Sequence, residues 1–294
     1  MTRYKVGLLG HGIGPSLSPA MHMREANRLG LDYEYRIVDL IDRPDVDLGQ
    51  ELRRLEDEGF VATNVTHPFK KAILEYVDDL SDGVRRIGSA NLVLLGDGRR
   101  TAYNTDYTGF RTALETFLAD RPAEGTVLQV GAGGAGLATA SALVDMDFAR
   151  IVVHDLIEDA TEALIERFAH ASGGRLIGSG GQLDRWLPEA TGVVHVTPTG
   201  MDQHAGIAFD VDALPTSAWV AEVVYFPLET ELVRRSRTRG LATLDGGGMA
   251  VGQAVDSLRL ITGLEPDMAR MHEHFNELVR ADDPREPDPR QAER

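Results

Sequence analysis

Short apolar runs alternate with segments of helical periodicity along almost the whole chain. The apolar runs are rich in β-branched residues, which favour strands, and the segments between them repeat apolar residues at the spacing of amphipathic helices. The predicted strands are Lys5–Leu9, Tyr33–Asp39, Phe60–Val65, Ala90–Leu95, Thr126–Val130, Ile151–His154, Val193–Val196, Val220–Val224 and Ala242–Leu244. The predicted helices are Pro19–Leu29, Pro68–Val77, Thr108–Ala119, Ala135–Asp147 and Ala250–Thr262, the last of them closed by Gly263.

This alternation predicts an α/β fold in which helices cover both faces of parallel sheets. The chain has 294 residues, enough for two domains with separate cores. A polar stretch, Leu118–Gly125, and a glycine-rich turn, Asp245–Met249, indicate where the chain passes between them. We expect an N-terminal open α/β domain of residues 1–107, completed by C-terminal helices in 247–280, a second domain of residues 108–246, and a charged, Pro-rich, disordered tail over 281–294.

Composition narrows the classes of function. The net charge of −16 argues against a nucleic-acid partner, because a phosphate backbone needs a basic face. The chain has no Cys, which excludes disulfides and thiolate chemistry, and it has no apolar run of the ~18 residues that a membrane helix needs. Its first apolar run is too short for a signal peptide, so we expect a cytoplasmic protein without membrane contact.

No metal site is expected. The nine His show no HxxxH pattern with carboxylates nearby. His272 and His274 stand two positions apart on a helical segment and point to different faces, so they are interpreted as surface residues.

A glycine-rich turn follows the predicted strand Thr126–Val130 and opens a predicted helix. It reads GAGGAG, a GxGxxG pattern whose strand and helix context makes it informative even in a chain with 31 Gly. In dinucleotide-binding folds the first glycine allows a tight turn, the second lets the backbone approach a pyrophosphate, and the third lets the helix pack close to the strand. The helix start adds free N–H groups and a partial positive charge. The cofactor-binding residues predicted here are Gly131, Gly133, Gly134, Ala135 and Gly136.

Asp155 ends the next predicted strand, 19 positions after Gly136. A carboxylate at this place accepts hydrogen bonds from the adenosine ribose and repels a 2′-phosphate. No cation follows until Arg167, so the sequence favours NAD over NADP. The alternative is that Asp155 only caps the following helix.

Small polar residues gather at predicted strand ends in the first domain, where ligands of open parallel sheets bind. Hydroxyls, amides, one ammonium and one carboxylate would together suit a polyhydroxylated carboxylic acid. Each residue alone has a plainer explanation. Ser18 and Asp106 could be helix caps, Asn91 and Asn104 could be turn formers, and Lys70 could be a solvated helix residue.

Seven motifs resemble those of the shikimate dehydrogenase family and occur in the family's order. They cover nearly the whole chain, and their combination is specific. They read SLSP at 16–19, NVTHPFK at 64–70, GSAN at 88–91, NTD at 104–106, VTPTGM at 196–201, VYFPLET at 224–230 and MAVGQA at 249–254.

The resemblance implies a reversible hydride transfer between C4 of nicotinamide and a secondary alcohol carbon of a cyclohexane or cyclohexene carboxylate. It implies that Lys70 and Asp106 contact the reacting hydroxyl as acid and base, and that Ser16 and Ser18 hold the substrate carboxylate. The same resemblance implies that Thr66, Asn91 and Gln253 bind ring hydroxyls, and that Tyr225 braces the carboxylate side or the cofactor cleft. It implies that the cofactor is bound by Thr197, Pro198, Val224 and Gly246. We expect a monomer or a homodimer whose partner is this small molecule.

Within the family the chain looks most like the NAD-dependent quinate/shikimate dehydrogenases of actinobacterial type. His67, the complete GxGxxG pattern, Asp155 and the segment LITGLEPDMARM at 260–271 support this assignment. Two other assignments within the family stay open, an NADP-dependent biosynthetic shikimate dehydrogenase and a dehydrogenase of a modified shikimate such as an amino derivative. A non-catalytic ligand sensor on the same fold is a further alternative.

Four positions depart from the family's pattern. Leu92 stands where Thr is usual, Tyr107 follows the NTD motif where a small residue is common, and Gly247 and Gly248 precede Met249 where a larger residue often stands. These positions are expected to lie around the substrate pocket. The ring substituents of the substrate are therefore expected to differ from those of shikimate.

Overall fold

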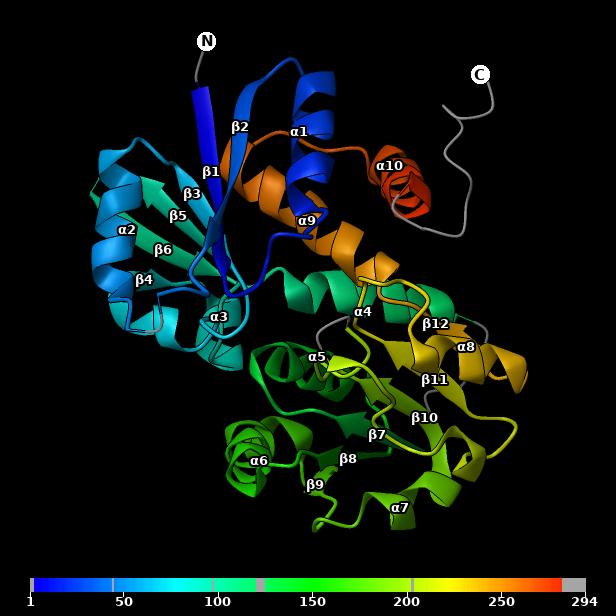
Figure 1. The fold of residues 1–294 in the computed structure, drawn as a ribbon. Coiled ribbons are helices and arrows are strands. Elements are labelled where there is room, and N and C mark those ends of the chain that lie inside the picture. The colour runs from blue at the N-terminus through cyan, green and yellow to red at the C-terminus, as the bar shows by residue number, and fades with distance from the viewer. Residues whose placement is uncertain (1–2, 44, 97, 120–124, 202–203, 282–294) are drawn as a thin grey trace, which may run out of the picture.

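The computed structural model describes residues 3–43, 45–96, 98–119, 125–201 and 204–281. Two six-stranded sheets carry helices on their faces and are joined by α4 (Asp106–Phe117), as Figure 1 shows. This is the predicted α/β fold. The predicted tail lies outside the described residues apart from Ala281, which ends α10 (Met268–Ala281). No helix in the described ranges is long and apolar enough to cross a membrane.

The first sheet has the strand order β2-β1-β3-β5-β6-β4. Its β5 runs antiparallel to both β3 and β6, so the sheet is mixed and the prediction of parallel strands throughout was wrong. Only two residues separate β5 from β6, and so short a link turns the chain back beside the strand it has just left. The strands are β1 (Arg3–Gly10), β2 (Asp32–Asp39), β3 (Ala62–Val65), β4 (Asp79–Leu80), β5 (Leu92–Gly96) and β6 (Arg99–Tyr103).

The second sheet is parallel throughout, with the order β12-β11-β10-β7-β8-β9. Read from β9, this is the 3-2-1-4-5-6 order of dinucleotide-binding folds. The strand order reverses between β7 and β10, and ligands of such sheets bind in the crevice beyond the carboxyl ends there. The strands are β7 (Thr126–Val130), β8 (Arg150–His154), β9 (Leu176–Gly178), β10 (Ala190–His195), β11 (Trp219–Glu222) and β12 (Ala242–Leu244).

Two kinds of element differ from the prediction. The strands β4, β6 and β9 were not predicted, because they are short or, like the sequence RRTAY of β6, carry few apolar residues. The predicted helix Pro68–Val77 contains only the 3-10 turn η1 (Ala72–Tyr76). Two further 3-10 turns are η2 (Leu187–Glu189) and η4 (Val211–Ala213).

The C-terminal helices return to the first sheet, as predicted, and pack against α1 through an apolar cluster that includes Met21, Val251 and Phe275. Gly263 ends α9 with a left-handed φ of 72°, again as predicted. His274 is buried and shares a helix face with Phe275, so its predicted surface position was wrong. The other helices are α1 (Ser18–Arg28), α2 (Leu48–Asp57), α3 (Asp82–Ile87), α5 (Gly134–Asp145), α6 (Glu158–Ser172), α7 (Leu183–Trp186), α8 (Glu231–Thr238) and α9 (Gly247–Thr262).

Helices α4 and α9 cross in close contact at two glycines. A Cβ built on Gly252 would lie 2.8 Å from Cα of Gly109, so neither position has room for a side chain. Asp106 begins α4 and Gln253 follows the crossing on α9. The close crossing therefore brings two predicted site residues from distant parts of the chain near one another.

Candidate active site

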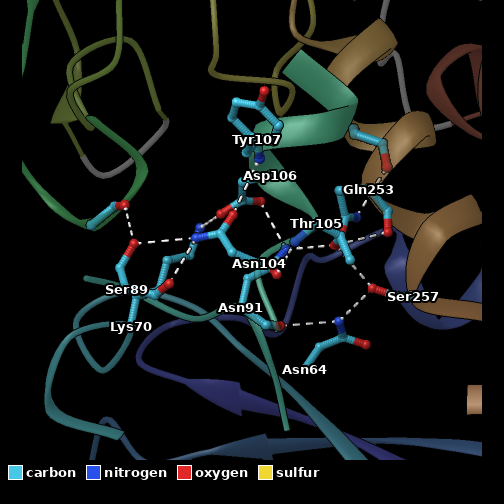
Figure 2. Close-up of polar contacts among 12 residues, drawn as sticks. Asn64, Lys70, Ser89, Asn91, Asn104, Thr105, Asp106, Tyr107, Gln253 and Ser257 are labelled. Carbon is cyan, nitrogen blue, oxygen red and sulfur yellow. Dashed lines mark hydrogen bonds and ion pairs between the residues drawn. The ribbon is translucent and has the colours of Figure 1, made fainter. Parts of the chain in front are cut away.

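Lys70 and Asp106 form a direct ion pair. Lys70 lies in the turn after β3, and its Nζ donates to Oδ2 of Asp106 over 2.6 Å (Figure 2). The two side chains are 15% and 7% exposed. Asp106 is the first residue of α4, but the capping position is Thr105 and no side chain caps the helix. Neither plainer explanation holds, because Asp106 is no cap and Lys70 is not solvated.

Asn91 holds the other carboxylate oxygen of Asp106. Its Nδ2 donates to Oδ1 of Asp106 at 3.0 Å and to Oγ1 of Thr105 at 2.9 Å. Its Oδ1 accepts from the backbone N–H of Thr105 at 2.7 Å. Both amide hydrogens of Asn91 are therefore used inside the protein, and Asp106 has one bonded partner on each oxygen.

A second polar layer lies behind Asn91. Its Asn64 begins the NVTHPFK motif, but the sequence did not single out Tyr35 or Ser257. Asn64 donates to Oγ of Ser257 at 3.0 Å and to the carbonyl of Asn91 at 3.1 Å (Figure 2). Oγ of Ser257 lies 3.2 Å from Oγ1 of Thr105. Burial raises the pKa of Tyr35, so its hydroxyl stays protonated and donates to Oδ1 of Asn64 at 3.0 Å. This layer fixes the residues that fix Asp106.

The first turn of α5 touches the ion pair from the second sheet. A Cβ built on Gly134 would lie 2.9 Å from Cβ of Lys70. The hydroxyl of Ser89 donates to the carbonyl of Gly134 at 2.8 Å, and Asn104 donates to the carbonyl of Ser89 at 2.9 Å. The glycine-rich loop predicted for the cofactor thus lies directly against the predicted acid/base pair.

Thr66 and His67 precede Lys70 in the same turn. Thr66 is half-buried at the end of β3, where the first domain's substrate residues were predicted. Partial burial, followed by the positive charges of His11, His204 and Lys70, lowers the pKa of His67. Its imidazole is therefore neutral near pH 7, and Lys70 is the cation at the centre of this turn.

Ser16 and Ser18 lie at the start of α1. The backbone N–H of Ser18 donates to Oγ of Ser16 at 3.3 Å, and the capping position is Leu17, so neither hydroxyl caps the helix. Tyr225 and Leu17 pack against the same apolar cluster, which puts Tyr225 on the Ser16 side of the site. Gln253 donates to a carbonyl of its own helix at 3.0 Å, and its backbone carbonyl accepts from a site hydroxyl.

The glycine-rich loop has the geometry that a dinucleotide requires. Gly131 has a φ of 118°, and a Cβ there would lie 2.7 Å from the carbonyl oxygen of Val196. A Cβ on Gly136 would lie 2.6 Å from the carbonyl oxygen of Gly131, so the helix packs close to the strand. Gly133 has nothing within 4 Å of its Cβ position, which leaves the backbone open to a phosphate. Gly134 and Ala135 follow in the first turn of α5.

Asp155 bonds the backbone of this loop and also the backbone just before the next helix. Its Oδ2 accepts from the N–H of Ala132 at 2.7 Å, and its Oδ1 accepts from the N–H of Ile157 at 2.9 Å. The capping position of α6 is Ile157, so Asp155 is not simply the helix cap. Leu156 beside it is 96% exposed.

The remaining predicted cofactor residues stand on the loops that follow the neighbouring strands β10, β11 and β12. Thr197 and Pro198 come after β10, and Val224 comes after β11. Gly246 precedes α9, and a side chain there would clash with the carbonyl of Val224. Thr197 borders the glycine-rich loop, since its Cγ2 lies 3.1 Å from a Cβ built on Gly131.

Comparison with known proteins identifies the family. The family described as shikimate dehydrogenase substrate binding domain matches residues 8–93. A shikimate dehydrogenase (NADP+) of Streptomyces avermitilis is 47% identical over 281 residues, which cover 94% of this chain and 96% of the relative. The chain belongs to the shikimate/quinate dehydrogenase family. A quinate/shikimate dehydrogenase (NAD+) of Corynebacterium glutamicum is 40% identical over 280 residues, which cover 93% of this chain and 98% of the relative.

Solved structures of the family share the whole fold. The quinate dehydrogenase of Corynebacterium glutamicum in complex with NAD has a TM-score of 0.85 at 39% identity, over 94% of this chain and 99% of that chain. The shikimate 5-dehydrogenase of Thermus thermophilus in complex with NADP(H) and shikimate has a TM-score of 0.81 at 32% identity, over the same shares of the two chains. These relatives include both NAD and NADP enzymes, so membership in this oxidoreductase family leaves the choice between the two cofactors open.

The residues that depart from the family's pattern make contacts of their own within the protein. Leu92 is fully buried in the core of the first sheet. Tyr107 turns toward the end of α5, where its hydroxyl donates to Oδ2 of Asp145 at 2.6 Å. A Cβ on Gly248 would lie 2.9 Å from Cβ of Ala113, so glycine there lets α9 pack on α4. That these residues lie around the substrate pocket stays a prediction.

Proposed function

We propose that this family member is an NAD-dependent dehydrogenase of shikimate- or quinate-type hydroxylated cyclic carboxylates. The observation that carries the proposal is the Lys70–Asp106 ion pair, which lies against Gly134 at the start of α5. A proton relay and a dinucleotide-binding loop thus share one place. When bound, nicotinamide supplies the hydride acceptor or donor at its C4.

Lys70 and Asp106 would handle the proton of the reacting hydroxyl. In oxidation the pair accepts this proton, and in reduction it returns the proton to the developing alkoxide. The two groups are 2.6 Å apart and little exposed. Oxidation of the alcohol releases a proton, so it should be favoured at alkaline pH.

Ser16 and Ser18 would bind the substrate carboxylate at the start of α1, where backbone N–H groups favour an anion. Together with Lys70 this gives local attraction for an acid in a protein whose net charge is −16. Thr66, Asn91 and Gln253 would bind ring hydroxyls. Asn91 can do so only through the second lone pair of its Oδ1, because both of its amide hydrogens are already bonded.

The surroundings of Asp155 support NAD as the cofactor. A 2′-phosphate would meet the carboxylate of Asp155 and those of Glu158 and Asp159, which open α6. The first cation downstream, Arg167, is turned to the first sheet, where it donates to the carbonyls of Arg85 and Arg86 at 3.3 Å. No Lys or Arg stands between Asp155 and Arg167 to bind a 2′-phosphate.

An NADP-dependent shikimate dehydrogenase is the second candidate. Three relatives that are 47%, 42% and 40% identical carry that name. A dehydrogenase of an amino-substituted shikimate is less favoured now that Leu92 and Tyr107 have other contacts. A ligand sensor would have no need of the ion pair beside the glycine-rich loop.

The test is the rate of nicotinamide reduction near pH 9, with NAD and NADP each paired with shikimate and quinate. Turnover with NAD and either acid is the expected result, and the ratio of the two acids identifies the preferred substrate. Turnover with NADP alone would replace the cofactor assignment and keep the reaction. No turnover with any of the four pairs would contradict the proposed function.

The domain boundaries belong to this proposal too. Residues 1–107 plus 247–280 would form the substrate-binding catalytic domain, and residues 108–246 the NAD-binding domain. The cytoplasmic location, the monomeric or homodimeric state and the independence from metal stay predictions.

A further inference from the structure

Two buried ionisable side chains stand at the ends of adjacent strands below the cofactor crevice. His195 ends β10 and Glu222 ends β11, and their side chains are 1% and 0% exposed. Nδ1 of His195 lies 2.8 Å from Oε1 of Glu222. Burying a carboxylate is costly unless hydrogen bonds compensate for the lost water, so the bonds of this pair indicate what it holds in place.

Glu222 holds the chain that follows β11. Its Oε1 also accepts from the N–H groups of Val223 at 2.9 Å and Val224 at 3.0 Å, and its Oε2 accepts from the hydroxyl of Thr230 at 3.1 Å. Thr230 is the capping residue of α8. The carboxylate thus fixes both ends of the loop that contains Tyr225.

His195 holds the loop that follows β10. Oε1 of Glu222 already accepts from two backbone N–H groups, so Nδ1 of His195 is the donor to it. In the tautomer with its hydrogen at Nδ1, Nε2 is an acceptor. Nε2 lies 2.6 Å from Oγ1 of Thr197, so the hydroxyl of Thr197 donates to His195. Oγ1 of Thr197 in turn accepts from the N–H of Thr199 at 3.2 Å. One line of hydrogen bonds therefore runs from the buried carboxylate into the loop.

This loop lies on the nicotinamide side of the crevice. Asp155, which would bind the adenosine ribose, follows β8 on one side of β7, whereas Thr197 follows β10 on the other. Cγ2 of Thr197 also packs on Gly131, at the turn of the glycine-rich loop. A shift of Thr197 would therefore move the wall that nicotinamide meets.

We propose that His195 is a positioning residue for the nicotinamide end of the cofactor site. Its Nε2 holds Thr197 in place, and Glu222 selects the tautomer in which Nε2 can accept. The inference rests on the proposed function, since it assigns a role in dinucleotide binding. His195 itself is buried and acts only through Thr197.

Two substitutions separate the two ring nitrogens. His195→Asn keeps a donor at the place of Nδ1 and loses the bond to Thr197, whereas His195→Gln reaches the place of Nε2 and loses the bond to Glu222. We expect His195→Asn to raise the KM for the cofactor and the directly titrated Kd for NADH about tenfold, with the KM for the acid substrate unchanged. His195→Gln should keep both cofactor constants within about threefold and instead lower the melting temperature.

Thr197→Val should reproduce the effect of His195→Asn, and the double variant should add nothing further, because both remove the same bond. Val193→Ala is the matched control, since it creates a cavity on the same buried strand and should lower the melting temperature with the cofactor constants unchanged. The measurements use whichever dinucleotide the wild-type protein turns over, because NAD and NADP share the nicotinamide end.

The following outcomes would overturn the inference. Unchanged cofactor constants in His195→Asn would show that the bond to Thr197 positions nothing, and equal effects of the Asn and Gln variants would reduce His195 to a packing residue. A wild-type protein that binds neither NADH nor NADPH would end both this inference and the proposed function. Wild-type turnover with unaffected variants would end this inference alone.

Discussion

At the scale of single residues, Asp106 has a partner on each carboxylate oxygen before any ligand arrives. Asn91 bonds Oδ1 and Lys70 bonds Oδ2, and the layer of Asn64 and Ser257 behind them bonds Asn91 and Thr105. A carboxylate held in this way does not have to reorient during the reaction, which is the usual advantage of a preorganised site. The same bonds explain why so polar a group tolerates burial.

Replacing Lys70 removes the group that we propose to exchange the proton. Lys70→Ala should lower kcat by about 10²–10⁴, the usual contribution of acid/base catalysis, as measured by steady-state kinetics with the preferred acid. Lys71→Ala is the matched control, because Lys71 is exposed and adjacent in sequence but makes no contact with Asp106. A loss confined to KM would reduce Lys70 to a binding residue.

Replacing Asp155 changes the charge that a 2′-phosphate would meet. Asp155→Asn keeps an oxygen that can accept from Ala132 or Ile157, and it should lower the ratio of kcat/KM for NAD to that for NADP about tenfold or more. Glu166→Gln removes an equal charge from an exposed position of α6 two turns further on, and should change this ratio less than about threefold. An unaltered ratio in Asp155→Asn would remove its assigned role.

The sequence identified those site residues that stand in motifs at strand ends, such as Lys70 and Asp106. It did not identify Ser257 or Glu222, because nothing in a local pattern distinguishes a buried hydroxyl or carboxylate that has partners from an ordinary helix or strand position. Ser257 bonds Asn64, which is 193 positions away, and Glu222 bonds His195, which is 27 positions away. Only the tertiary fold brings such residues together.

At the scale of elements, the crossing of α4 and α9 positions the site. A Cβ on Gly109 would lie 2.7 Å from the backbone nitrogen of Gln253, and a Cβ on Gly252 would lie 2.8 Å from Cα of Gly109. Thr105, just before α4, donates to the carbonyl of Gln253 at 3.1 Å. The distance between these helices therefore sets the separation of Asp106 from Gln253.

Gly252→Ala should push the two helices apart. The expected loss is about 1–3 kcal/mol in the free energy of unfolding, measured by urea denaturation, together with a lower kcat. Gly83→Ala is the matched helical control, because its Cβ would meet nothing nearer than Oγ of Ser81 at 4.0 Å. That variant should be neutral or more stable by about 0.5–1 kcal/mol. Equal behaviour of the two variants would contradict the role of the crossing.

The helix predicted at Pro68–Val77 shows where local pattern loses to tertiary contact. The apolar periodicity is present, but the carbonyl of Lys70 accepts from the N–H of Ala90 at 2.8 Å instead of from a residue one turn ahead. The turn is thereby opened at Lys70, and only a short 3-10 turn follows. The sequence correctly predicted the order of most strands and helices, but it could not predict which backbone groups the rest of the chain would claim.

At the scale of the whole molecule, α3 and the turn after it connect the two sheets. Arg86 donates to Oδ2 of Asp145 on α5 at 2.8 Å, Arg167 of α6 donates to the carbonyls at the end of α3, and Ser89 donates to Gly134. Burial raises the pKa of Asp145, but hydrogen bonds and charges from Arg86, Tyr107 and Arg111 outweigh burial and leave this pKa below its ordinary value. Asp145 is therefore ionised at neutral pH and holds Arg86 across the two sheets.

Acid should weaken the first half of the molecule through His22. Burial lowers the pKa of His22 from 6.5 to about 3, so the unfolded chain binds a proton below pH 6.5 that the folded protein does not. Stability is therefore lost as the pH falls from 6.5 toward 3, by about 2 kcal/mol at pH 5, and it is unaffected by this group above pH 7.

His22→Asn keeps an atom at the place of Nδ1 for the hydroxyl of Tyr33 and cannot titrate. Urea denaturation at pH 7 and pH 5 should show a smaller loss between these values for the variant than for the wild-type protein. The other buried His residues also have lowered pKa values, so they lower the stability of both proteins in acid. Comparing the variant with the wild-type protein removes this shared contribution. Parallel losses would contradict the assignment to His22.

The contact between Gly134 and Lys70 has a consequence for redesign. A loop grafted from another dehydrogenase could carry a larger residue at position 134. That residue would displace the side chain of Lys70, so the proposed base would no longer be in its place. The two halves of this catalyst cannot be exchanged as independent modules. Asp155, which bonds Ala132 and Ile157, is proposed to meet the other end of the dinucleotide, so engineers who want a different cofactor should begin there.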